Sequence, residues 1–234
     1  ALTAAGCAVT RHPLRRENRF DVDGGLLDVI APGVELVFLC TPNNPTGRLV
    51  DGALLRAATE QCRAVGAVLA VDECFLDFLP DGETLTMKPE LAAHGGLFIL
   101  KAFTKLYGMA GVRLGYGLCA DAALLERMRR AGQPWAVSAL AQAAGLAALT
   151  QRDYVRQVRV LIETERPYLL AGLRALGLRV IEGRANYLLF RADETLGERL
   201  EARGALIRRC GNYPGLDDTW YRTAVRTRHE NDAL

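Results

Sequence analysis

Long apolar runs alternate with amphipathic segments along the first half of the chain. Residues 34–40, 67–71 and 96–100 are apolar runs of strand length. The segment after Asp51 has the apolar spacing of a helix of about fifteen residues, with Asp51 as its N-cap. Strand, helix and strand in succession, with apolar runs in the strands, are typical of a parallel sheet covered by helices. The pattern therefore predicts an α/β fold with a mostly parallel sheet.

The second half of the chain predicts a smaller unit. A long helix is expected over residues 153–176, and Pro167 should kink or divide it. The other predicted elements are helices at 121–133, 138–149 and 196–203, strands at 178–181, 186–190, 205–208 and 220–225, and a helix end at 1–8 that leads to a strand at 7–11. We therefore predict two domains, a large one over residues 1–154 and a small α+β one over residues 155–234.

Polar residues follow the ends of three predicted strands. Asn44 lies in the turn-forming run that follows the first strand, Asp72 closes the second, and Lys105 comes just after the third. Ligands of parallel α/β sheets bind at the carboxyl ends of the strands. Taken singly, Asp72 is equally a helix cap or an ion-pair partner, and Asn44 a turn residue. The shared placement of all three favours a common site.

Lys105 stands between two apolar segments, residues 96–100 and 112–119, and Arg113 follows it eight residues later. Burial would lower the pKa of this amine and make it a usable nucleophile, as a Schiff-base lysine must be. The planar, permanently charged guanidinium of Arg113 suits a phosphate. Such a pair is the minimum set for holding pyridoxal 5'-phosphate (PLP). The alternative is a lysine that extends to solvent and a surface ion pair.

The predicted small domain is rich in arginine, and two of these residues lie inside apolar strands. Arg208 and Arg222 flank the loop 210–216, and on the wall of a cleft they would bind an anionic substrate. The alternative is a solvated basic face, which is the more common meaning of a run of charges.

Composition narrows the classes of function. The 234 residues are 50% hydrophobic and carry a formal net charge of +2, which allows a sizeable core and gives no argument for a nucleic-acid partner. No apolar window predicts a membrane span or a membrane partner, and no signal peptide is recognisable. The six cysteines have no metal-like spacing, so we expect reduced thiols and no metal site. These features predict a cytoplasmic protein.

Four motifs in chain order carry a resemblance to a known family. They are Asn44-Pro45-Thr46-Gly47, Asp72-Glu73-Cys74-Phe75, Thr104-Lys105 with Arg113, and Tyr221-Arg222. With this order and spacing the chain resembles the fold-type I PLP enzymes of the histidinol-phosphate aminotransferase group. Segments 133–138, 183–189 and 207–216 look like the threonine-phosphate decarboxylases, the cobalamin-pathway branch of that group.

The resemblance implies a role for each motif residue near the cofactor. Lys105 would bond covalently to PLP and then act as acid and base. Asp72 would pair with the protonated pyridine nitrogen, and Asn44 would hydrogen-bond the 3-oxygen of the ring. Arg113, helped by the Thr104 hydroxyl, would bind the cofactor phosphate.

The resemblance also implies a substrate and a reaction. Arg222 would bind the substrate carboxylate and Arg208 the substrate phosphate. The implied reaction is decarboxylation of L-threonine O-3-phosphate to 1-amino-2-propanol O-2-phosphate by a homodimer. One alternative is an aminotransferase acting on histidinol phosphate or another amino acid. The other is a truncated chain without catalysis, because the family has an N-terminal segment with a glycine-rich phosphate loop that this sequence is expected to lack.

Two positions depart from the family pattern. Ala102 stands where the family has a serine on the cofactor phosphate, which predicts weaker cofactor binding. Phe75 stands where transaminating relatives have a tyrosine that donates to the 3-oxygen. Because a phenyl ring cannot donate a hydrogen bond, Phe75 favours the decarboxylase interpretation.

Overall fold

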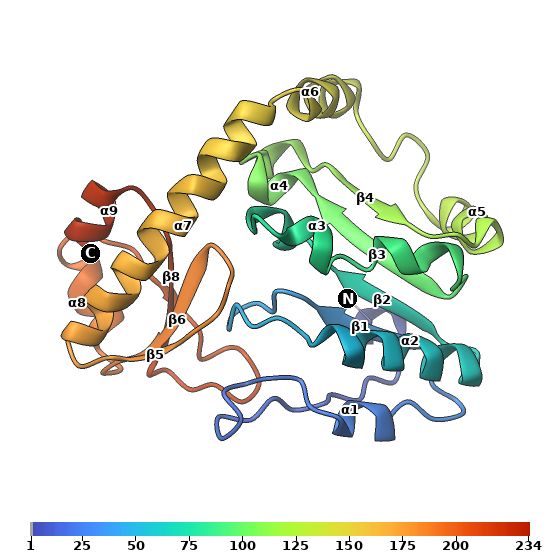
Figure 1. The fold of residues 1–234 in the computed structure, drawn as a ribbon, viewed down its shortest axis with the longest axis horizontal. Coiled ribbons are helices and arrows are strands. Elements are labelled where there is room, and N and C mark those ends of the chain that lie inside the picture. Colours follow the sequence, from blue (N-terminus) through green and yellow to red (C-terminus); the bar gives the residue numbers. More distant parts are fainter. Residues whose placement is uncertain (1) are drawn as a thin grey trace.

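The computed structural model describes residues 2–234 and contains two four-stranded sheets (Figure 1). The first sheet has the order β1-β2-β3-β4, in which β1 (Leu36–Cys40), β2 (Val68–Asp72) and β3 (Leu97–Ala102) are parallel. The strand β4 (Gly115–Leu118) lies antiparallel to β3. The predicted α/β class with a mostly parallel sheet is therefore confirmed.

The second sheet is antiparallel and has the order β5-β6-β8-β7. Its strands are β5 (Arg179–Ile181), β6 (Tyr187–Arg191), β7 (Arg208–Arg209) and β8 (Trp220–Ala224). The long helix α7 (Arg152–Ala175) extends from beside the first sheet to the second (Figure 1). The proposed domain boundary at residue 154 would fall in the first turn of α7 and stays a prediction.

The other helices connect the strands and cover the sheets. They are α1 (Gly25–Asp28), α2 (Gly52–Val65), α3 (Gly82–Leu85), α4 (Phe103–Leu106), α5 (Ala122–Ala131), α6 (Ala139–Leu149), α8 (Leu196–Glu201) and α9 (Arg228–Ala233), with short 3-10 turns at Thr3–Ala5, Leu76–Phe78, Lys88–Ala92 and Ala110–Val112. No helix within residues 2–234 combines the length and the apolarity that crossing a membrane requires.

Helix α2 shows how a local signal and tertiary packing agree. The Asp51 carboxylate accepts the backbone N–H groups of Ala53 and Leu54 at 2.8 and 3.1 Å, as its N-cap position predicts. Leu55 and Ala58 on the apolar face of the helix are buried in the same cluster as the strand residues of the first sheet. The burial of this face packs α2 against the first sheet, in which β1 and β2 are paired in parallel.

Two expectations about local structure are wrong at the chain beginning and at β7. Residues 7–11 form no strand, and a single 3-10 turn, Thr3–Ala5, precedes them; residue 1 lies outside the described part of the chain. The strand expected at 205–208 is only Arg208–Arg209. Leu206 is 86% exposed and faces solvent, whereas Ile207 is half-buried against the core of the second sheet.

Pro167 does not divide the long helix, which continues from Arg152 to Ala175. Ile162 before the proline and Leu169 after it are buried in one cluster with residues of the second sheet. Packing on both sides of the proline offsets the loss of one backbone hydrogen bond.

Candidate functional site

The first three strands end side by side, which brings the segments that carry Asn44, Asp72 and Lys105 to one edge of the sheet. Cys40, the last residue of β1, is aligned with Asp72, the last residue of β2, and Asp72 is aligned with Leu100 of β3. Asn44 lies four residues beyond β1, and Lys105 lies in α4 directly after β3. Parallel topology therefore produces the placement that the sequence predicted.

Lys105 is exposed, which corrects the expectation that it is buried. On the single turn of α4, Phe103 and Leu106 occupy the buried face, so the side chain between them extends outward. The Lys105 Nζ atom lies 5.5 Å from the centre of the Phe75 ring. No ion pair engages this ammonium within the described residues, so the Lys105 side chain is sterically free to contact a ligand.

The other two lysines of the chain are already engaged. Lys88 forms a surface ion pair with Glu83 at 3.2 Å. Lys101 is 3% exposed, and its Nζ lies 3.0 Å from the Glu73 carboxylate. The lysine that lies at a strand end and remains available for covalent chemistry is therefore Lys105.

Asn44 contacts the second sheet at this edge of the first sheet. Its side-chain Oδ1 accepts hydrogen bonds from the Tyr213 hydroxyl (3.3 Å) and from an Arg222 guanidinium nitrogen. The Arg222 guanidinium lies 5.0 Å from the centre of the Tyr187 ring, and Tyr187 donates from its hydroxyl to the Asn43 carbonyl at 2.9 Å. With its oxygen occupied, the Asn44 amide offers its N–H groups to a ligand.

Aromatic contacts connect Asn44 to Lys105. The Phe75 ring, beside which Lys105 lies, contacts the Tyr187 ring edge to face at 5.1 Å. The Tyr187 ring in turn contacts the Arg222 guanidinium, which donates a hydrogen bond to Asn44. The structure therefore connects Asn44, Lys105 and Arg222 through contacts. Asp72 ends β2, the strand that lies between β1 and β3.

Arg208 and Arg222 are directly opposite each other on β7 and β8. Arg208 also donates to the Asn212 side chain at 3.0 Å and lies 5.6 Å from the centre of the Tyr213 ring. Residues directly opposite in an antiparallel pair share one face, where like charges are destabilising by a few tenths of a kcal/mol up to about 1 kcal/mol. An anion bound between them would remove this repulsion.

Arg113 and Thr104 are less clearly joined to this group. Arg113 is exposed, has a left-handed backbone (φ 59°), and donates to the Ala110 carbonyl at 3.2 Å. Thr104 is half-buried on α4 next to Lys105. No contact joins Arg113 to Thr104 within the described residues, so their shared role stays a prediction.

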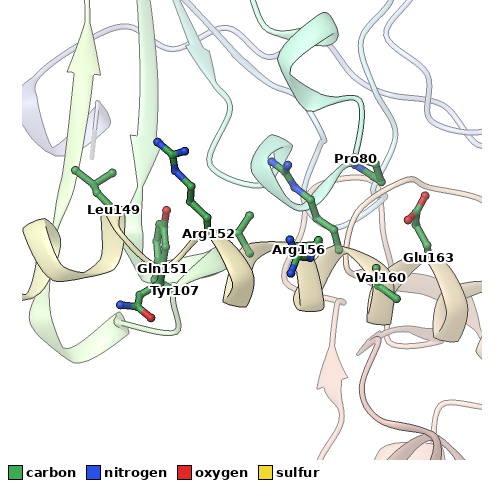
Figure 2. A pocket seen from close by; sticks show the side chains of 10 residues that line it. Pro80, Tyr107, Leu149, Gln151, Arg152, Arg156, Val160 and Glu163 are labelled. Atoms are coloured by element: carbon green, nitrogen blue, oxygen red, sulfur yellow. The ribbon is translucent and has the colours of Figure 1, made fainter.

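Two cavities of the described residues lie elsewhere, along α7. The larger one has a volume of about 450 Å³ and is lined by residues such as Tyr107, Arg152 and Arg156 (Figure 2). The smaller one, about 420 Å³, lies between α7 and Arg228. None of the predicted site residues lines either cavity, so the site rests on the contacts described above.

Two thiols adjoin Asp72. Burial, and then the charge of Asp72, raise the pKa of the Cys40 thiol to about 12. Burial and a hydrogen bond to Asp72 likewise raise the pKa of the Cys74 thiol. Because the thiolate is the reactive form, neither cysteine can serve as a nucleophile at neutral pH.

We predict that Cys40 resists alkylation in the folded protein. With its pKa at about 12, only about one Cys40 thiol in 10⁴ is ionised at pH 8. Iodoacetamide at that pH should label the exposed Cys7 and leave Cys40 unlabelled, as peptide mass spectrometry would show. Labelling in urea is the control, because it must modify both. Equal labelling rates in the folded protein would contradict the raised pKa.

Sequence reasoning overlooked several residues that build the site. Tyr187 donates to the Asn43 carbonyl and Tyr213 to the Asn44 side chain, and Lys101 forms a buried ion pair with Glu73. Lys101 had a readable signal, since it interrupts an apolar strand. The tyrosines had none, because their partners lie more than 140 positions away along the chain.

Comparison with known proteins gives consistent matches. The family model described as aminotransferase class I and II matches residues 1–234. Threonine-phosphate decarboxylase of Salmonella typhimurium is 39% identical over 238 residues, which cover 100% of this chain and 65% of that protein. Histidinol-phosphate aminotransferase of Methanothermobacter thermautotrophicus is 37% identical over 222 residues, 92% of this chain and 57% of that protein.

A solved structure agrees with these matches. The histidinol-phosphate aminotransferase of Clostridium acetobutylicum superposes with a TM-score of 0.93 at 26% identity, over 99% of this chain and 70% of that one. The chain thus spans 57% to 65% of the length of the two curated relatives.

Proposed function

The chain belongs to the aminotransferase class I and II family, and from this premise we propose that it decarboxylates L-threonine O-3-phosphate. The observation that carries the proposal is the pair Arg208 and Arg222, opposite each other on β7 and β8, with Arg222 bound to Asn44. Two cations on one face beside the cofactor residues suit a substrate with two anionic groups, a carboxylate and a phosphate. The 39% identity of the chain to threonine-phosphate decarboxylase of Salmonella typhimurium supports the same proposal.

PLP is the cofactor of this family, and the residues present fit it. Lys105 offers an amine for the cofactor aldehyde, Asp72 a carboxylate for the ring nitrogen, and Asn44 an amide N–H for the ring oxygen. Thr104 and Arg113 would bind the phosphate. When bound, the cofactor supplies an electron sink for the carbanion that bond cleavage leaves.

The side chains of this protein would then decide which bond breaks. Arg222 would hold the substrate carboxylate so that its bond to Cα stands perpendicular to the cofactor ring, and Arg208 would hold the phosphate. Lys105 Nζ would deliver a proton to Cα after carbon dioxide leaves. Phe75 cannot donate a hydrogen bond to the ring oxygen, unlike a tyrosine at that position.

The second candidate is an aminotransferase, which the 37% identity to histidinol-phosphate aminotransferase favours. The two reactions differ in their products, and one assay separates them. The purified holoenzyme is expected to release one carbon dioxide for each threonine phosphate consumed and to leave 2-oxoglutarate unchanged. Consumption of 2-oxoglutarate without carbon dioxide release would replace the decarboxylase proposal with the aminotransferase one.

Arg208 gives a prediction about substrate recognition. Arg208→Met should raise KM for threonine phosphate about tenfold to a hundredfold, because a charged hydrogen bond contributes about 1.5–3 kcal/mol. The matched control is Arg209→Met, since consecutive strand residues point to opposite faces and Arg209 lies 3.7 Å from Glu198 instead. Steady-state kinetics of both variants test this. Equal effects at 208 and 209 would remove Arg208 from the substrate site.

A further inference from the structure

A buried ion cluster lies directly behind the candidate site. Glu73 is 0% exposed and Lys101 is 3% exposed. The Lys101 Nζ atom lies 3.0 Å from the Glu73 carboxylate and 2.8 Å from the Asp77 carboxylate. Glu73 also accepts the Thr86 hydroxyl at 2.6 Å and the Met87 backbone N–H at 2.8 Å. Each charge of the cluster is therefore paired.

Lys101 stays charged, although its side chain is withdrawn from water. Burial alone would lower the pKa of Lys101, but the carboxylates of Asp77 and Glu73 outweigh this effect and raise it. Buried ion pairs of this kind are often no more stabilising than well-packed apolar residues of similar volume. Their advantage over apolar residues is directional, because charged hydrogen bonds fix the groups that they join.

The cluster joins the backbone segments that carry Asp72 and Lys105. Glu73 directly follows Asp72, and Lys101 lies on β3 four residues before Lys105. Asp72 is the last residue of β2, and Glu73 is the first residue beyond that strand. The Glu73 backbone N–H also donates to the Leu100 carbonyl at 3.0 Å, which extends the contact between β2 and β3.

The same cluster reaches the long helix. Asp77 lies in the 3-10 turn Leu76–Phe78, and its backbone carbonyl accepts from Arg159 Nε of α7 at 2.9 Å. The cluster is therefore attached to the end of β2, to the end of β3 and to the helix that leads to the second sheet.

We propose that Glu73, Lys101 and Asp77 are positioning residues that set the distance and orientation between Asp72 and Lys105. The proposal rests on the cofactor site described under the proposed function. A shift of about 1 Å between groups that must engage one ligand can lower a rate by about a hundredfold. The cluster would prevent such a shift because its ion pairs fix the end of β2 relative to the end of β3.

The test uses variants in which the buried charges are removed, so that an effect on cofactor positioning can be distinguished from an effect on stability. In the holoenzyme, Lys101→Met leaves two unpaired carboxylates and should lower the thermal midpoint. The double variant Lys101→Met/Glu73→Gln removes the buried charges and should restore the midpoint to within a few degrees of wild type. Positioning predicts that this double variant still binds PLP at least about tenfold more weakly and shows an altered visible absorbance, with kcat lowered more than KM.

Wild-type PLP affinity, absorbance and kcat in the double variant would overturn the proposal, because the cluster would then be only structural. Asp77→Asn is the second variant, since its side chain is 26% exposed and its loss should leave the chain folded. An unchanged PLP affinity and spectrum in Asp77→Asn would also overturn it. Glu83→Gln, which removes the surface ion pair between α3 and Lys88, is the control that should change none of these quantities.

The readouts separate this proposal from the proposed reaction. A wild-type holoenzyme that binds PLP but releases no carbon dioxide from threonine phosphate would refute the decarboxylase proposal alone. PLP affinity and absorbance would still report whether the cluster positions Asp72 and Lys105. A wild-type protein that shows no absorbance of bound PLP would refute both.

Discussion

Lys105→Ala is expected to abolish the visible absorbance of covalently held PLP and to lower decarboxylation by about 10³-fold or more. The amine has two uses in the proposed reaction, as the group that bonds to the cofactor and as the proton donor to Cα. Proton transfer by a positioned side chain alone contributes about 10²- to 10⁴-fold. Absorbance spectra and carbon dioxide release of the purified variant measure the two losses separately.

The chain offers a matched control for this substitution, because it has three lysines in different settings. Lys88→Ala removes an exposed ammonium that pairs with Glu83, and should leave absorbance and activity as in wild type. A small primary amine such as methylamine, added to the Lys105→Ala protein, should restore part of the activity by replacing the missing proton donor. A variant at 105 that retains the absorbance band would refute our assignment of the reactive lysine.

The second large effect is expected from Gly183→Ala, at the place where the two halves of the chain meet backbone to backbone. A Cβ atom at Gly183 would overlap the Thr46 carbonyl oxygen and lie 2.6 Å from Gly47 Cα. The Arg184 backbone N–H donates to the Gly47 carbonyl at 2.7 Å, which holds the two segments in this contact. Rigid backbone on both sides leaves the methyl group no space, so the turn that carries Asn44 must move.

We therefore expect Gly183→Ala to lower the free energy of unfolding by about 1–3 kcal/mol, the usual cost of an inserted methyl in a packed region. PLP affinity should fall at the same time, because Asn44 lies two residues before Thr46. Thermal unfolding and a PLP titration measure the two effects.

Gly172→Ala is the control for this substitution. Gly172 is exposed on α7, and a Cβ there would have no neighbour within 4 Å. Alanine in a helix interior is favoured over glycine by about 0.5–1 kcal/mol, so this variant should be slightly more stable than wild type. Equal stability of the two variants would show that the contact at Gly183 is not as tight as the structure has it.

Local patterns in the sequence predicted the main elements correctly. The apolar runs became β1, β2 and β3, and Asp51, Asp121 and Ser138 cap α2, α5 and α6 through hydrogen bonds within three residues. These features depend on neighbours along the chain, which is why residue types alone reveal them. The order of parallel strands then places Asn44, Asp72 and Lys105 at one edge without further information.

The tertiary structure decided which lysine side chains are exposed and which residues distant in the sequence are in contact. Lys105 was expected to be buried because apolar segments flank it, but in a one-turn helix its neighbours occupy the buried face. The buried lysine is Lys101, whose partner Glu73 lies 28 positions earlier. Gly183 faces Gly47 across 136 positions, and Arg222 reaches Asn44 across 178.

What the sequence by itself determined is therefore which segments form strands and helices, and which polar residues stand at the strand ends. What only the tertiary structure decided is which of those residues are in contact and which lysine is buried. It also decided that Arg208 and Arg222 lie opposite each other next to the candidate site. The physical reason is that secondary structure depends on hydrogen bonds and burial repeated every few residues. A site depends on single contacts between loops, and their geometry is set by how whole sheets pack.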